Sequence, residues 1–198
     1  MGVHAVTEDG VAGDLHATIV RHAADTVSGV PRPRLLTVTD TRARWLDQDQ
    51  QHTWRAYLVG QTLLMDRLDD ELREAFGIGL NEYEVLVRLS EADQHALRMS
   101  TLADAMRFSR SRITHTISRM EAAGWVERCK SGDDGRGIVA QLTDQGYALL
   151  VEAAPTHVTG VREHLVDIAD ADDFAAMGRV MDAVVDKLSA AHPEVDIR

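Results

Sequence analysis

The chain has 198 residues, enough for one domain with an extension and a full hydrophobic core. Its apolar content of 44% and charged content of 27% are typical of soluble globular proteins. The net charge of -11 argues against a protein that coats nucleic acid without sequence preference, because phosphate affinity is largely electrostatic.

Targeting and redox signals are sparse. No apolar run approaches the roughly 18 residues that span a bilayer, so no membrane partner is expected. The N-terminus MGVHAVTEDG has acidic residues but no basic region followed by an apolar core, so we expect no secretory signal. Cys129 is the single cysteine, so an internal disulfide is ruled out. We therefore expect a cytoplasmic protein.

The charge is distributed unevenly along the chain. Between Leu97 and Arg136 there are eight Arg or Lys and five Asp or Glu, a local charge of +3 that leaves -14 on the remainder. This asymmetry indicates a local basic surface on an acidic protein.

Residues 1–40 carry the weakest structural pattern. A short amphipathic stretch, Asp14 to Val27, is followed by SGVPRPR, whose prolines break a helix. We predict a poorly ordered N-terminal extension. The alternative is an arm that packs on the core or on a partner subunit.

Helical periodicity begins near Trp45. An apolar stripe runs to Phe76, and the glycines that follow indicate the end of the helix. Asn81 is the predicted N-cap of a second helix, a short third helix follows near residues 100–108, and a fourth runs from about Ser109 to Ala123.

After Gly124 the apolar period changes to two. WVERCK and IVAQLT predict a two-stranded hairpin around the tip SGDDGRG, and Thr143 is expected to cap the next helix. A last helix carries apolar residues at alternating spacings of three and four, as in a coiled-coil contact face.

This order of elements predicts a mainly α fold with a small β-wing. The predicted parts are an N-terminal dimerisation helix at 41–78, a winged helix-turn-helix domain at 79–142 and C-terminal dimerisation helices at 143–198.

The helix at 109–122 has two distinct faces. Ile113, Ile117 and Met120 fall together and should face the core, whereas small polar residues lie opposite, with Arg112 and Arg119 flanking them. Small polar side chains let a helix approach base edges, and arginines reach phosphate or guanine. The alternative is an ordinary solvated helix face.

The hairpin tip carries Asp134 and Arg136. The carboxylate could hold the guanidinium by paired hydrogen bonds and direct it into a narrow minor groove, where the negative potential is enhanced. The alternative is a surface turn with an incidental ion pair.

Together these segments resemble the MarR family of bacterial transcriptional regulators. The resemblance runs from about Trp54 to Leu188 and rests on GIGLNEYEVLVRLSEA, RMSTLADAMRFSRSRITHTISRMEAAGWVER, the Asp134-Gly135-Arg136 wing and QLTDQGYALL. The extension before Arg44 lies outside it.

The resemblance implies a homodimeric repressor whose two winged helices bind double-stranded DNA in successive major grooves of a pseudo-palindrome. It implies no cofactor. The DNA-facing residues that it implies are Ser109, Arg110, Ser111, Arg112, Thr114, His115, Ser118 and Arg119 on the helix, with Asp134 and Arg136 in the wing.

Family members commonly bind a small aromatic or anionic effector between the dimer helices and the winged domain. On the first long helix, the side chains that could line such a cleft are His52, Trp54, Arg55 and Tyr57. Dimer packing with solvated helix ends is the alternative explanation of these residues.

Redox and metal sensing have weaker support. Arg128 and Lys130 could depress the pKa of Cys129, but a small residue on a wing strand explains the cysteine equally well. His157 and His164 lie seven apart on one helix face; no metal site is predicted, because the histidines are otherwise scattered.

Two other functional classes are alternatives to a DNA-binding regulator. A winged helix that contacts only proteins would suit the acidic background. An enzyme is disfavoured, because the sequence has no Ser-His-Asp order, no Gly-rich phosphate loop and no HExxH spacing.

Overall fold

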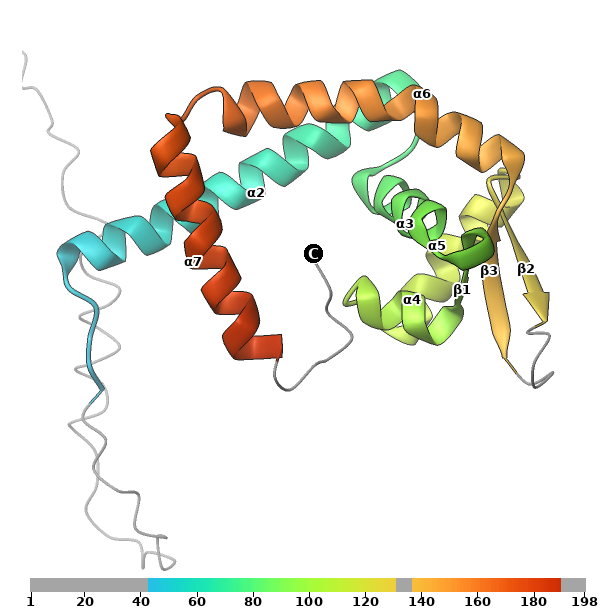
Figure 1. The fold of residues 1–198 in the computed structure, drawn as a ribbon, viewed down its shortest axis with the longest axis horizontal. Helices are drawn as coiled ribbons and strands as arrows, with labels where there is room; N and C mark the ends of the chain where they lie inside the picture. The colour runs from blue at the N-terminus through green and yellow to red at the C-terminus, as the bar shows by residue number, and fades with distance from the viewer. Residues whose placement is uncertain (1–42, 131–136, 190–198) are drawn as a thin grey trace, which may run out of the picture. The chain divides into compact units, whose positions relative to one another are not determined.

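The computed structural model describes residues 43–130 and 137–189 (Figure 1). The chain divides into two units, Met1–Trp45 and Leu46–Arg198, and every element below belongs to the second. The predicted N-terminal extension at 1–40 and the wing residues Asp134 and Arg136 lie outside the described residues. Within the described ranges, no helix combines the length and hydropathy that crossing a lipid bilayer would require.

The described chain is mainly helical with one small sheet. The helices are α2 (Gln48–Phe76), α3 (Leu80–Glu91), α4 (Met99–Ala105), α5 (Arg110–Ala122), α6 (Asp144–Val161) and α7 (Ala171–Ser189). A π-helical segment, Arg162–Val166, continues α6, and a 3-10 turn, Asp93–His95, follows α3. The strands are β1 (Ala96–Arg98), β2 (Val126–Lys130) and β3 (Ile138–Leu142). This confirms the predicted fold class.

The sheet is antiparallel with the order β1-β3-β2. The predicted hairpin is present, and it pairs Val126 with Leu142 and Lys130 with Ile138. The third strand, β1, was not predicted from the sequence; its Leu97 pairs with Ala140 of β3. It follows two residues with left-handed backbone, Gln94 and His95, which turn the chain back toward the sheet.

The core lies between α3, α4, α5 and the sheet. Ile113, Ile117 and Met120 of α5 are all buried, so the predicted inner face of that helix is confirmed. Leu86 of α3 and Leu102 of α4 are fully buried in the same cluster. Because one face of α5 is held in this core, its opposite face points outward.

Polar groups fix the turn between α2 and α3. Gly77 adopts a left-handed φ of 70°, which ends α2, and the Asp69 carboxylate accepts a hydrogen bond of 2.8 Å from the backbone N–H of Leu80. Glu82 accepts a bond of 3.2 Å from Gly79, which is the N-cap of α3. The prediction that Asn81 caps this helix is therefore wrong, since Asp69 and Glu82 bind the first N–H groups instead.

The start of α6 is bound tightly to the turn before β2. The Thr143 hydroxyl accepts a hydrogen bond of 3.0 Å from the N–H of Gly146 and lies 2.7 Å from the carbonyl oxygen of Gly124, confirming the predicted cap. A methyl group at Gly146 would come within 2.0 Å of the Trp125 carbonyl oxygen, so only glycine fits there. The wing and α6 therefore share one junction.

Helix α7 makes few contacts with the other described elements. Its apolar stripe stays open to solvent, with Val184 44% and Leu188 61% exposed. The first half of α2 is similar, because Val59 and Leu63 are also exposed. These two helices thus present apolar surface that the single chain leaves uncovered.

Candidate nucleic-acid interface

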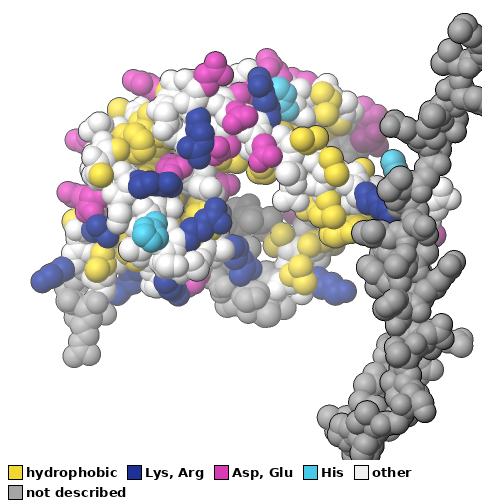
Figure 2. All heavy atoms as spheres, turned by 180° about the vertical axis from the view of Figure 1, so that it is seen from behind, with side chains coloured by type: hydrophobic (Ala, Val, Ile, Leu, Met, Phe, Trp, Pro, Cys, Tyr) yellow, Lys and Arg dark blue, Asp and Glu magenta, His cyan; other side chains and the backbone are white. Residues whose placement is uncertain are grey.

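The exposed edge of α5 lies beside the wing strands. Ser109 caps the helix, its hydroxyl accepting a hydrogen bond of 3.2 Å from the N–H of Arg112, so the first turn is well defined. The side chains of Ser111, Thr114 and His115 are exposed along this edge. In Figure 2, Lys and Arg side chains gather over the lower part of the molecule, whereas Asp and Glu side chains are prominent along its upper edge.

Arg110 joins the start of α5 to α4. Its guanidinium donates to the Ser100 carbonyl oxygen and to the Asp104 carboxylate, with an Nη2–Oδ2 distance of 3.1 Å. Both partners are on α4, so this arginine links the two helices of the helix-turn-helix. It is one of the predicted DNA-facing residues, and in this structure its charge is already paired.

Arg119 joins the other end of α5 to α3. Its Nη2 donates to Glu82, whose carboxylate also receives the N–H of Gly79. Glu82 is only 6% exposed, while the Arg119 side chain remains largely open to solvent. A buried carboxylate with two donors holds the guanidinium on one side of the helix.

The third pair joins α5 to the wing. Glu121 accepts hydrogen bonds from the backbone N–H of Arg128 at 3.1 Å and from its Nε at 2.9 Å. The hydrogen bond from the Arg128 side chain lowers the pKa of Glu121 below its ordinary range, so the carboxylate is charged at neutral pH. Strand β2 is therefore anchored to the C-terminal turn of α5.

Arg112 differs from these arginines. Its guanidinium carbon lies 3.7 Å from the centroid of the Phe108 ring. In the part of the chain that the structure describes, no carboxylate pairs with it. It is thus the α5 arginine whose in-plane N–H donors have no acceptor within the described protein.

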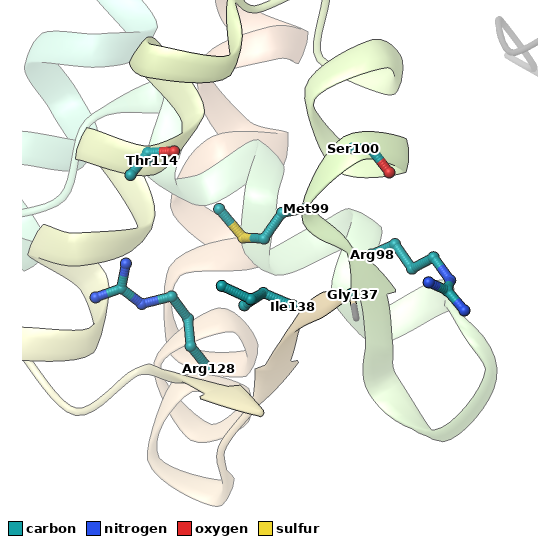
Figure 3. A pocket seen from close by; sticks show the side chains of 7 residues that line it. All are labelled: Arg98, Met99, Ser100, Thr114, Arg128, Gly137 and Ile138. Atoms are coloured by element: carbon teal, nitrogen blue, oxygen red, sulfur yellow. The ribbon is translucent and has the colours of Figure 1, made fainter. Parts of the chain in front are cut away.

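A cavity of about 330 Å³ lies between α5, the start of α4 and the wing (Figure 3). Met99 and Ile138 contribute apolar side chains to the middle of its lining. The Arg128 guanidinium points from β2 toward α5, whereas the Arg98 side chain points away from the other lining residues. Thr114 of α5 is also part of the lining.

The structure therefore brings most of the predicted set onto one helix. Ser111, Arg112, Thr114 and His115 are exposed, and Ser118 is half-buried. The sequence reasoning missed Phe108 and the three carboxylates that bind arginines. Phe108 precedes Ser109, the N-cap of α5, so its contact with Arg112 depends on the turn between α4 and α5 and not on helical spacing.

The four predicted effector residues do not share one surface. Trp54 and Tyr57 stack with their ring centroids 5.8 Å apart and an interplanar angle of 24°. His52 and Arg55 lie elsewhere around α2, because successive residues of a helix turn by about 100°. All four side chains are exposed in the single chain.

The residues considered for metal and redox sensing are His157, His164 and Cys129. His157 packs on Tyr83, with ring centroids 4.6 Å apart, while His164 lies 2.8 Å from the Glu71 carboxylate. Within the described ranges, no group of three or more His, Cys, Asp or Glu is placed to hold a metal ion. Burial and the nearby Glu127 carboxylate raise the pKa of Cys129, opposite to the effect that flanking basic residues would have.

Helices α3, α4 and α5 and the antiparallel sheet, whose strands β2 and β3 form a hairpin beside α5, define a winged helix-turn-helix. This is a class of nucleic-acid-binding fold. The family model described as "MarR family" matches residues 76–137. The regulator PecS of Dickeya dadantii is 28% identical over 156 residues, covering 74% of this chain and 94% of PecS.

Two further relatives are informative. The transcriptional repressor MprA of Escherichia coli is 31% identical over 86 residues, which is 43% of this chain and 49% of MprA. Sco3205 is a MarR family transcriptional regulator from Streptomyces coelicolor that was solved in complex with DNA, and it is 38% identical to this chain. The structural match covers 73% of this chain and 94% of Sco3205, with a TM-score of 0.69. The present chain belongs to the MarR family, a family of transcriptional regulators and not of enzymes.

The link between Glu82 and Arg119 is testable by a double-mutant cycle of Glu82→Ala and Arg119→Ala. We expect a coupling of roughly 0.5 to 3 kcal/mol in urea unfolding, because the two groups are in direct contact and Glu82 is buried. The control cycle uses the exposed pair Arg162 and Asp167, which should couple by at most about 1 kcal/mol. Equal coupling in both cycles would mean that Glu82 does not hold α5.

Proposed function

We propose that this chain is a sequence-specific transcriptional repressor that binds double-stranded DNA in the cytoplasm as a homodimer and releases it when a small effector binds. The observation that carries the proposal is the exposed polar edge of α5, which the core holds outward beside the wing. A solved MarR family relative bound to DNA supports this use of the fold, and a relative named as a repressor supports the direction of regulation.

The DNA-contacting residues that we propose are those of the predicted set. Ser111, Thr114 and His115 present short or planar polar groups that can approach base edges in the major groove. Arg110 and Arg119 would reach phosphates only at the edge of their existing ion pairs, so their first role is to position α5. Asp134 and Arg136 would contact the minor groove from the wing.

A charge placed on the exposed edge tests this surface. Ser111→Glu should weaken binding to the selected operator at least about tenfold, because it sets a carboxylate against the phosphate backbone. Ala148→Glu, an equal charge change on exposed α6, should leave the affinity nearly unchanged. Fluorescence anisotropy on duplexes enriched from a random library provides the measurement.

The outcome that contradicts DNA recognition is also defined. If the wild-type chain enriched no sequence and bound every duplex weakly and only at low salt, a winged helix that contacts proteins would be the better explanation.

The proposed partner for the uncovered apolar faces of α2 and α7 is a second copy of the chain. Val59, Leu63, Val184 and Leu188 are large, apolar and exposed, and a single folded chain rarely leaves such residues together in solvent. A dimer would also place two copies of α5 at the spacing of successive major grooves, about 10 base pairs.

Val184→Glu should convert the dimer to a monomer, because it buries an unpaired charge in the proposed interface. Asp182→Asn, on the opposite side of α7, should leave the dimer intact. Light scattering coupled to size exclusion gives both masses. A wild-type chain that is monomeric at micromolar concentration would refute the dimer and, with it, the palindromic operator.

For the effector we propose a small aromatic or anionic molecule that contacts the stacked pair Trp54 and Tyr57, with His52 and Arg55 as further candidates if the partner subunit closes the site. The stacked aromatic faces suit a planar aromatic molecule.

A thermal-shift series with benzoate and its hydroxylated derivatives tests the effector site. Binding to the folded protein should raise the melting temperature by mass action, and Trp54→Ala should remove the shift. Trp45→Ala, which alters an exposed tryptophan before α2, is the matched control. A shift that survives Trp54→Ala would locate the effector elsewhere.

A further inference from the structure

We propose that Phe108 is a positioning residue for sequence recognition, holding Arg112 so that its guanidinium contacts a guanine in each half of the operator. This inference rests on the proposed function, because it assumes that the exposed edge of α5 lies in the major groove.

The arginines of α5 differ in whether a carboxylate pairs with them. Of its three arginines, Arg110 pairs with Asp104 and Arg119 pairs with Glu82. Arg112 has no such pair within the described chain, and its guanidinium contacts an aromatic ring instead. It is therefore the arginine on this helix with a full set of donors available to a ligand.

Phe108 contacts Arg112 through its ring. A guanidinium carbon 3.7 Å from a ring centroid is in close cation–π contact. Guanidinium groups stack on aromatic faces, and their N–H donors, which lie in the guanidinium plane, then stay available to a ligand. Phe108 therefore restrains Arg112 without using its hydrogen bonds.

Phe108 is itself held in place by the fold. Its ring is half-buried against the hydrophobic core, and its backbone N–H donates to the Ala103 carbonyl oxygen at 2.9 Å. Arg107, directly before it, has a left-handed φ of 55°, which turns the chain sharply between α4 and α5. The support beneath Arg112 thus belongs to the rigid part of the fold, which lowers the entropic cost of ordering the arginine on DNA.

The contact favours guanine over phosphate. Arg112 is the third residue of α5, and the N-terminal residues of such helices contact base edges. A phosphate contact needs mainly a positive charge, whereas a bidentate contact to the O6 and N7 of guanine needs the planar fork in one orientation. Contact with the ring restricts the orientations open to the guanidinium, and the short side chains of Ser111 and Thr114 leave room for the base pair.

The test begins with an operator selected from random duplexes by the full wild-type chain. Affinities are then measured on that operator and on versions with each G·C pair replaced, for wild type, Phe108→Met, Phe108→Tyr and Arg112→Lys. For wild type we expect discrimination of about tenfold or more at one symmetric pair of G·C positions. Phe108→Met and Arg112→Lys should reduce it to about twofold at those positions alone, while Phe108→Tyr, which keeps the ring, should retain it.

Each alternative result is decisive. Unchanged discrimination in Phe108→Met would overturn the role of the ring, and unchanged discrimination in Arg112→Lys would make Arg112 a phosphate contact. A variant that lost folding would lose affinity at every position together, and Phe108→Leu would then be measured on the same panel. If wild type selected no sequence at all, the proposed function itself would fail, which is a different result from a selected operator without an Arg112-dependent guanine.

Discussion

The position of α5 is set by the buried core and by arginine–carboxylate pairs that link the helix to the elements around it. The core buries one face of the helix, and the close packing of those side chains resists rotation and sliding. The pairs add direction, and each goes to a different element: Arg110 with Asp104, Arg119 with Glu82, and Arg128 with Glu121. Acidic residues thus position the basic surface, which reconciles a net charge of -11 with a helix edge suited to an anionic partner.

Local patterns in the sequence were sufficient to predict the elements that carry this surface. The start of a helix near Ser109, the inner face of Ile113, Ile117 and Met120, and the cap at Thr143 all follow from residue types within one or two helical turns. The hairpin was equally predictable, because the alternation of apolar and polar residues on both sides of a Gly- and Asp-rich tip is a short-range signal. Family resemblance added the dimer and the DNA, which remain proposals for this chain.

The features that the sequence could not provide all depend on residues far apart in the chain. Glu82 and Arg119 are 37 residues apart, and nothing in either segment alone indicates that they meet. Strand β1 has three residues, too few for a periodic pattern, and it exists because β3 offers it a free edge. Asn81 has the residue type of a cap, yet Asp69, from the preceding helix, binds the N–H of Leu80, and α3 starts two residues earlier than an Asn81 cap would place it.

The outward edge of α5 has one more consequence. Ser111, Thr114 and His115 belong neither to the buried cluster nor to the ion pairs that hold the helix. Exchanging such surface side chains usually changes the free energy of folding by no more than about 0.5 kcal/mol. Duplicated copies of this gene could therefore acquire new target sequences through point changes on that edge, with the scaffold inherited unchanged.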